Sequence, residues 1–415
     1  MIRDSRGIWS SLTFALLCCY IVVLPVRFQF RWLLVRIQLV ILVSVGLSVL
    51  AGRDRVVLTR TQLAVLVVLG LTVCATIAGQ VMSVSGKNFG RIPENTRFLV
   101  LALACVLELD TTKRLQKTLA VLTATTATVS FLSIINLFIP LSFAFTGQVR
   151  TLGPIALNLP RSLGISMPFG SFGIISVIGT AYASMSLFRP QILHGSERRN
   201  VRVLSAIALL LILIGVALGK SRSTILAMLI VAGIALIVGA THPDIRLRSN
   251  RPVVPRSILL TGGAVATISS FKLAGNVIEA NAASVYSRVT QYHLALELLN
   301  ERPLFGWGWN YTEIVMEANT TVHNLWLLIG VSLGLPIMLL WLYLFARLAL
   351  RTTQSAIDGP GWVRPYAVIG TAIVLGGSVE LMFSLTFTPA TAVLIGLVTA
   401  IQGLGKYETI SFRST

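Results

Sequence analysis

Charged residues are scarce in this chain of 415 residues, and acidic residues are the scarcest of them. Asp, Glu, Lys and Arg make up 12% of the sequence, and 15 acidic side chains stand against 34 basic ones, for a net charge of +19. In a soluble protein this excess would suggest a nucleic-acid partner. Here the cations separate apolar segments instead of forming one basic face, so they indicate membrane topology and an anionic ligand. We expect no nucleic-acid partner.

Cysteines and acidic motifs are also few, and this excludes several kinds of site. The sequence has no DxD or HxxH motif, and the carboxylates between the apolar runs form no close pair of the glycosidase type. We therefore expect no metal site, no cofactor and no hydrolase acid pair. The four cysteines lie inside apolar runs without metal-ligand spacing, so neither a disulfide nor a zinc site is expected. They are Cys18, Cys19, Cys74 and Cys105.

Long apolar runs, in contrast, recur from one end of the chain to the other. Hydrophobic residues make up 55% of the sequence, and a run of about 20 of them spans the hydrocarbon core of a bilayer as a helix. The sequence therefore predicts an all-α polytopic membrane protein with about twelve transmembrane helices. The runs are 9–26, 32–51, 61–80, 98–109, 118–140, 164–187, 203–219, 223–240, 257–271, 323–346, 366–385 and 389–404.

The distribution of Lys and Arg predicts the orientation of these helices. The inter-helix segments that are richest in Lys and Arg are assigned to the cytoplasm, and both termini fall on that side. This orientation leaves one long outer loop, 272–322. Within it, Ser284 to Arg302 has apolar residues at helical spacing and is predicted to form an amphipathic helix, which would also suit the membrane surface. Pro303 and the following Gly-Trp-Gly-Trp run would end that helix.

Basic residues on the predicted outer side point to an anionic ligand. Lys220 and Arg222 lie in GKSRSTILAML, a short turn between two apolar runs, where charges need a partner or an aqueous cavity. A serine in this turn could cap the following helix, whose free amides would also face an anion. The planar fork of arginine suits phosphate. Snorkelling of the two side chains to the interface is the alternative explanation.

His323 and Asn324 begin the apolar run TTVHNLWLLIGVSLGLP on the same predicted side. The amides and the positive end of the helix dipole disfavour an imidazolium there, so the ring is expected to be neutral, as a general base requires. Asn324 could orient a ligand hydroxyl or cap the helix. A purely structural histidine is the alternative.

Three stretches together carry a resemblance to a known family: SRSTILAML, then SVYSRVTQYHLALELLNERPLFGWGWN, then HNLWLLIGVSLGLP. Over about Val203 to Phe345 the chain resembles the O-antigen ligase and O-antigen polymerase superfamily of bacterial membrane glycosyltransferases. The family pattern ends in His-Asn, nine residues, Gly, two residues and Gly. His323, Asn324 and Gly334 fit it, whereas Ile337 replaces the final glycine, which affects helix packing more than chemistry.

The resemblance implies a GT-C-like helical fold and a metal-independent, inverting glycosyltransferase in the bacterial inner membrane, with its active site facing outward. It implies a polyprenyl pyrophosphate-linked glycan donor and a glycan or glycolipid acceptor, both meeting in membrane lipid. By position, Arg222 and Arg288 would bind the pyrophosphate, Lys220 would be a third contact, and His323 would deprotonate the acceptor. The implied divisions are N-terminal helices 1–202, a ligase-like core 203–346 that includes the outer loop 272–322, and C-terminal helices 347–415.

Two alternatives remain open at this stage. The shared motif does not separate a ligase, which moves a finished glycan to a different acceptor, from a polymerase, which joins repeat units. A transporter or flippase of lipid-linked saccharides would also need about twelve helices and a basic cavity. It would not need a base at His323, and paired half-repeats, which transporters tend to have, are not evident in the sequence.

Overall fold

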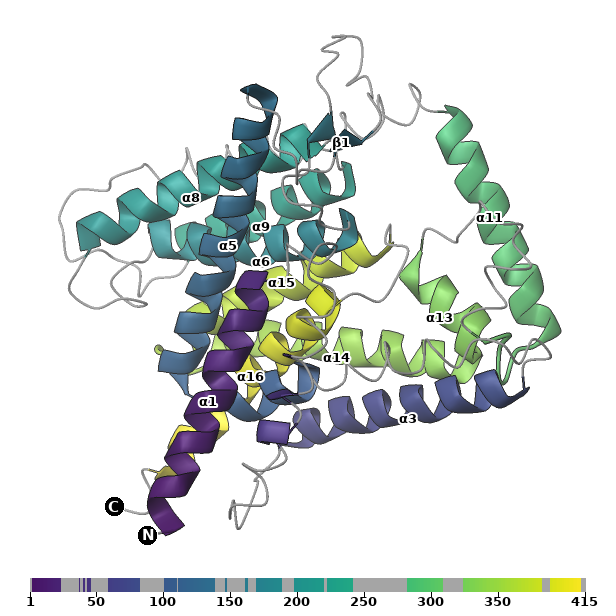
Figure 1. The fold of residues 1–415 in the computed structure, drawn as a ribbon, viewed down its shortest axis with the longest axis horizontal. Coiled ribbons are helices and arrows are strands. Elements are labelled where there is room, and N and C mark those ends of the chain that lie inside the picture. Colours follow the sequence, from purple (N-terminus) through teal and green to yellow (C-terminus); the bar gives the residue numbers. More distant parts are fainter. Residues whose placement is uncertain are drawn as a thin grey trace. The chain divides into compact units, whose positions relative to one another are not determined.

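The computed structural model is almost entirely helical (Figure 1). Two-residue strands β1 (Thr146–Gly147) and β2 (Arg161–Ser162) pair antiparallel, with Thr146 opposite Ser162. The structure describes residues 2–23, 37, 40–41, 43–45, 59–82, 101–109, 111–138, 146–147, 161–162, 169–188, 198–219, 222–241, 282–308, 324–382 and 389–411.

The described helices follow the apolar runs closely. Residues 101–108 are helical as well, and the predicted run 257–271 lies outside the described residues. The labelled helices are α1 (Ile2–Val23), α3 (Arg60–Met82), α5 (Thr112–Phe138), α6 (Phe169–Phe188), α8 (Arg198–Gly219), α9 (Arg222–Thr241), α11 (Ala282–Glu301), α13 (Leu325–Leu333), α14 (Leu335–Asp358), α15 (Arg364–Met382) and α16 (Pro389–Ser411).

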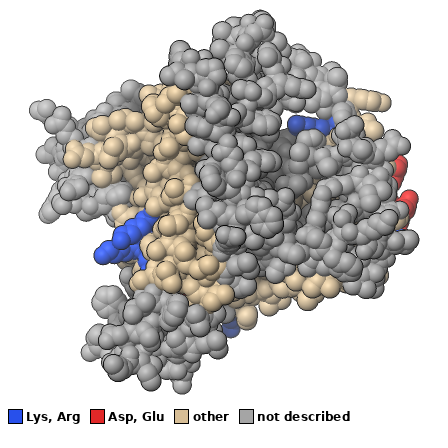
Figure 2. All heavy atoms as spheres, viewed as in Figure 1, with Lys and Arg blue, Asp and Glu red and all other residues tan. Residues whose placement is uncertain are grey.

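Several of these helices are long and apolar enough to cross a membrane. Five of the described helices reach that length, and on the face drawn in Figure 2 most described atoms belong to uncharged residues. In α8, Leu204, Ile207 and Leu210 are all exposed at three-residue spacing, as expected of a helix that faces lipid. A multi-pass helical membrane protein is therefore confirmed, while the count of twelve and the GT-C-like fold stay predictions. The five spans are Arg60–Ala78, Thr112–Ile135, Asn200–Leu218, Leu335–Asp358 and Arg364–Met382.

The chain folds into two compact units, each built from separated segments. The first unit contains residues 1–115, 283–351 and 381–415. Here α3 packs against α13 and α16, and Trp341 Nε1 of α14 donates a 3.0 Å hydrogen bond to Thr72 Oγ1 of α3. Glu108, 1% exposed, accepts from Ser10 at 2.6 Å and from Arg114 at 2.9 Å. These bonds pair a carboxyl group that would be costly to bury alone.

The second unit contains residues 116–282 and 352–380. Its centre is α6, which packs against both α8 and α9. Gly179 of α6 and Gly215 of α8 allow close approach, because a Cβ at either position would lie close to a side chain of α5 or α8. A helix that is apolar all round is expected to be buried in this way.

The region of the predicted outer loop differs from the sequence prediction in one respect. The amphipathic helix predicted over 284–302 is present as α11, Ala282–Glu301. The single helix predicted over 323–346 is instead two helices, because α13 stops at Leu333 and α14 starts at Leu335. The contacts at this break are described below.

Candidate functional site

Arg288 lies on the packed face of α11. It is half-buried, and the buried residues Ala295 and Leu299 follow it at seven and eleven positions, which places all three on one stripe of the helix. His293 and Glu297 are exposed and lie on the opposite side of the helix. Of these titratable side chains, Arg288 is therefore the one directed toward the interior of its unit.

An apolar cluster joins α11 to α13 on this packed face. Ala295, Leu298 and Leu299 of α11 form it with Val331 of α13. Partly buried hydrophobic side chains packed against the cluster are Tyr292, Leu294, Trp307, Leu327 and Leu335. Helix α13 is thereby held between α11 and α3, since it also packs against α3.

A backbone clasp fastens the C-terminal ends of the two helices. We use clasp for residues 303–308, which follow α11, paired with residues 331–335 at the end of α13. Trp307 N donates to Val331 O at 2.8 Å, Gly308 N to Ser332 O at 2.9 Å, and Leu335 N to Pro303 O at 2.7 Å. These bonds satisfy carbonyl groups that the end of a helix leaves without an intrahelical partner.

Two glycines make the clasp possible. Gly306 has φ +66° and Gly334 has φ +94°, which side chains disfavour. A Cβ on Gly306 would lie 2.5 Å from the carbonyl carbon of Ser332, and one on Gly334 would lie 2.5 Å from that of Leu304. Each glycine thus lies against the backbone of the other segment. The motif PLFGWG (303–308) and Gly334, which the sequence shows as separate motifs, therefore contact each other.

Trp307 and Arg302 complete the clasp. Trp307 Nε1 donates to Leu298 O at 2.8 Å, and Arg302 Cζ lies 3.9 Å from the centroid of the Trp307 ring. The tryptophan ring is therefore engaged within the protein, where it closes the C-terminal end of α11. Arg302, a basic residue of the predicted outer loop, thus has a contact with Trp307 within the protein.

Asn324 is the N-cap of α13. Its backbone is extended, and its side-chain Oδ1 accepts hydrogen bonds from Trp326 N at 3.0 Å and Leu327 N at 3.2 Å. This satisfies two amides at the start of the helix, as N-cap residues do. Of the two roles the sequence offered for Asn324, capping is the one found. His323, the residue before it, lies outside the described residues.

Arg288 and Asn324 lie toward the same end of the α11–α13 pair. Both helices end at the clasp, and a helix rises about 1.5 Å per residue. Along the helix axes, Asn324 is therefore about 15 Å from Gly334 and Arg288 about 20 Å from Glu301. The cluster and the clasp thus connect the two elements that carry the predicted base and one predicted arginine.

A buried amide lies close to Arg288 on α11. Gln291 is 7% exposed, and within the described part of the chain its Oε1 has no hydrogen-bond partner. A buried carbonyl oxygen of this kind is costly unless a donor reaches it. The sequence did not mark Gln291, because a glutamine in an amphipathic helix carries no motif of its own.

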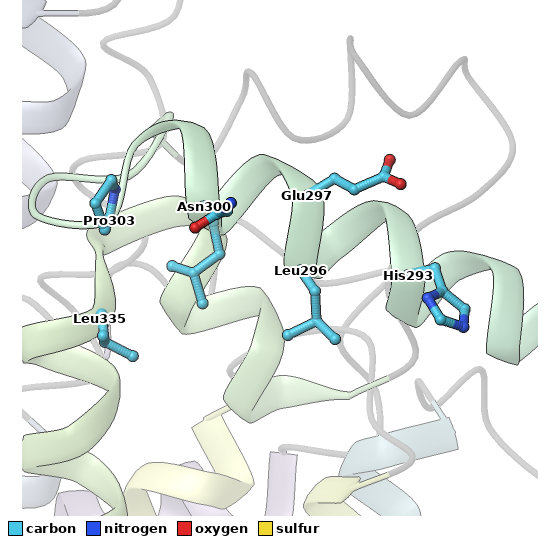
Figure 3. A pocket seen from close by; sticks show the side chains of 7 residues that line it. His293, Leu296, Glu297, Asn300, Pro303 and Leu335 are labelled. Atoms are coloured by element: carbon cyan, nitrogen blue, oxygen red, sulfur yellow. The ribbon is translucent and has the colours of Figure 1, made fainter.

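A surface pocket of about 460 Å³ lies beside the C-terminal half of α11 (Figure 3). Its titratable side chains, His293 and Glu297, face away from Arg288, so these two groups and the predicted donor contact Arg288 lie on different sides of the helix. The remaining lining residues are Leu296, Leu299, Asn300, Pro303 and Leu335.

The start of α9 belongs to the second unit. Arg222 is the first residue of α9, although its side chain lies outside the described residues, as does Lys220. The two residues that follow Arg222, Ser223 and Thr224, hydrogen-bond to the buried carboxyl of Glu380 on α15. Glu380, a carboxyl group within a predicted apolar run, thus has hydrogen-bond partners in the structure.

The described residues contain no group of three or more His, Cys, Asp or Glu side chains that could hold a metal ion. The expectation of metal-independent chemistry stays a prediction.

Comparison with known proteins supports the predicted resemblance. Residues 207–342 match the O-antigen ligase family, a segment that runs from within α8 to within α14 and includes the clasp and Asn324. The resemblance to the O-antigen ligase and polymerase superfamily is therefore confirmed for this part of the chain. No curated protein matches the chain.

Proposed function

We propose that this protein is a metal-independent, inverting glycosyltransferase of cell-surface polysaccharide synthesis. It moves a glycan from a polyprenyl pyrophosphate donor to the hydroxyl of a glycan or glycolipid acceptor at the outer face of the bacterial inner membrane, with both termini in the cytoplasm. The core of this activity is the segment 203–346. The observation that carries the proposal is the match of residues 207–342 to the O-antigen ligase family.

The proposed chemistry needs cations at the departing pyrophosphate and a base at the attacking hydroxyl. Arg222 and Arg288 bind the pyrophosphate, Lys220 adds a third contact, and His323 takes the proton of the acceptor hydroxyl as its oxygen attacks the anomeric carbon. The C–O bond to the pyrophosphate breaks as the new glycosidic bond forms on the opposite face of the sugar. Polyprenyl pyrophosphate leaves with the electron pair.

Three features of the first unit support this assignment. Arg288 lies on the interior face of α11, and Asn324 fixes the first turn of α13 directly after His323. Gln291 offers a buried oxygen near Arg288, suited to accept from a sugar hydroxyl. Because Asn324 Oδ1 is used for capping, its Nδ2 group is the part that would contact a ligand.

Acceptor-dependent transfer is the direct test of this function. Purified protein in nanodiscs would receive lipid-linked oligosaccharide from the native host, with and without acceptor, and glycosylated product would be measured by mass spectrometry. A ligase should form product only when a separate acceptor is present, whereas a polymerase should also join the lipid-linked units to one another. A transporter or flippase, the alternative function, would form none. Product length would separate a ligase from a polymerase.

Donor binding tests the arginine assignment separately. Arg288→Ala and Arg222→Ala are each expected to weaken donor affinity about tenfold or more, the loss expected for a charge-assisted phosphate contact. Arg302→Ala is the matched control for Arg288→Ala. Arg302 directly follows α11, the helix that carries Arg288, and its guanidinium lies over the Trp307 ring. This control variant should leave donor affinity unchanged. Equal donor affinity in wild type, Arg288→Ala and Arg222→Ala would remove the pyrophosphate assignment.

Metal independence is part of the same proposal. Transfer should continue in EDTA because arginine and histidine side chains supply the charge and the base. Loss of transfer in EDTA that magnesium restores would contradict it.

A further inference from the structure

A buried carboxyl group lies at the start of α9. Glu380 of α15 is 3% exposed, and its Oε2 accepts a 3.1 Å hydrogen bond from Thr224 Oγ1. The Ser223 side chain hydrogen-bonds to the same carboxyl. Both hydroxyls belong to the first turn of α9, which begins at Arg222. Polar bonds therefore tie this turn to α15.

Helix α6 packs closely against this polar contact. A Cβ on Gly173 would lie 2.8 Å from Thr224 Oγ1 and closer still to the carboxyl of Glu380. The neighbours of Gly173 in sequence, Phe172 and Ile174, are buried and apolar. A carboxyl group in such surroundings is costly unless its hydrogen bonds are made, so the bonds to α9 are needed to keep it there.

We propose that Glu380 is a positioning residue for the donor site. Through Ser223 and Thr224 it holds the first turn of α9 and so fixes the backbone from which Arg222 extends. The inference rests on the proposed function, which assigns Arg222 to the pyrophosphate. It adds that Glu380, although distant from Arg222 in sequence, controls how well Arg222 binds the pyrophosphate. A bidentate arginine–phosphate contact depends on geometry, so a shift of this turn reduces donor binding.

The test measures donor KM and kcat for release of polyprenyl pyrophosphate in nanodiscs. Glu380→Ala removes both hydrogen bonds and should raise donor KM about tenfold or more, with a smaller effect on kcat. Glu380→Gln keeps an acceptor oxygen and should restore most of the loss. Thr224→Val removes one bond at equal volume and should raise donor KM about threefold, which tests the same contact if Glu380→Ala does not fold.

A double variant shows whether the effect passes through Arg222. In an Arg222→Ala background, Glu380→Ala should change donor KM by less than about twofold, because coupled residues are not additive. Glu108→Gln is the matched control. Glu108 is also buried and hydrogen-bonded, but its partners Ser10 and Arg114 are not assigned to the donor site, so Glu108→Gln should lower stability without changing donor KM.

The outcomes separate this inference from the proposed function. Unchanged donor KM in Glu380→Ala and Thr224→Val, or full additivity with Arg222→Ala, would overturn the positioning role and leave the glycosyltransferase proposal intact. Unchanged donor KM in Arg222→Ala would remove the donor contact itself, and the positioning role with it.

Discussion

Asn324 uses its side-chain oxygen to cap α13, and this fixes the point at which His323 precedes the helix. Asn324→Ala should lower the free energy of unfolding by about 1 kcal/mol, the usual cost of losing such a cap. Asn324→Asp keeps an acceptor oxygen and adds a negative charge that the helix N-terminus favours, so its stability should match wild type.

The transfer rates of these two variants should rank in the opposite order to their stabilities. The added carboxylate of Asn324→Asp would repel a pyrophosphate, so this variant should be stable but transfer poorly. Thermal unfolding in nanodiscs and transfer rates, measured on the same samples, check both halves. Equal stability of Asn324→Ala, Asn324→Asp and wild type would contradict the capping role.

Gln291 offers a second test at the residue scale. If its buried Oε1 accepts from a donor sugar, Gln291→Leu should raise donor KM about fivefold. It should also stabilise the unliganded protein or leave it unchanged, because it removes an unsatisfied buried oxygen. Gln291→Glu keeps an acceptor but adds a negative charge beside the proposed pyrophosphate contact, so it should raise donor KM further than Gln291→Leu. A donor KM that is the same in wild type and Gln291→Leu would exclude a ligand contact.

At the scale of the elements, the clasp decides how α11 and α13 are held. Gly306→Ala and Gly334→Ala should each destabilise the protein by about 2 kcal/mol or more, since each combines a disfavoured φ with contact against backbone. Gly70→Ala in α3 is the control, because a Cβ at Gly70 would have no other atom within 4 Å among the described residues. It should be neutral or stabilising. Equal thermal stability of the clasp variants and Gly70→Ala would contradict the clasp.

The sequence predicted some of these elements and missed others for identifiable reasons. Helical spacing within one segment predicted the helix over 284–302, and the structure has it at Ala282–Glu301. Apolar periodicity did not predict the break at Gly334, where the chain lies against the backbone of Leu304 from another segment. Asn324 and Arg288 were found from motifs, whereas the role of Glu380 was not, since its partner Thr224 is 156 residues away.

Over the whole molecule, the excess of basic side chains predicts which ends of the helices face the cytoplasm. Asn300 lies in the predicted outer loop. Gln354 lies between Arg351 and Arg364, which are predicted to be cytoplasmic, and both Asn300 and Gln354 are exposed. With the native cysteines replaced by alanine, Asn300→Cys should react with a membrane-impermeant maleimide in intact cells. Gln354→Cys should react only after the cells are opened. Labelling of Gln354→Cys in intact cells would reverse the proposed orientation.

The most direct test of the account is acceptor-dependent release of polyprenyl pyrophosphate by wild type and His323→Ala in nanodiscs. A general base contributes about 100-fold to 10,000-fold to the rate. The rate of release should therefore fall at least about 100-fold in His323→Ala, while donor affinity changes little. Asn324→Ala, which removes the cap and the proposed Nδ2 contact but no base, should lose less of the rate than His323→Ala. Wild-type release that His323→Ala leaves unchanged would contradict a catalytic His323, and no release by folded wild type supplied with both substrates would favour the transporter.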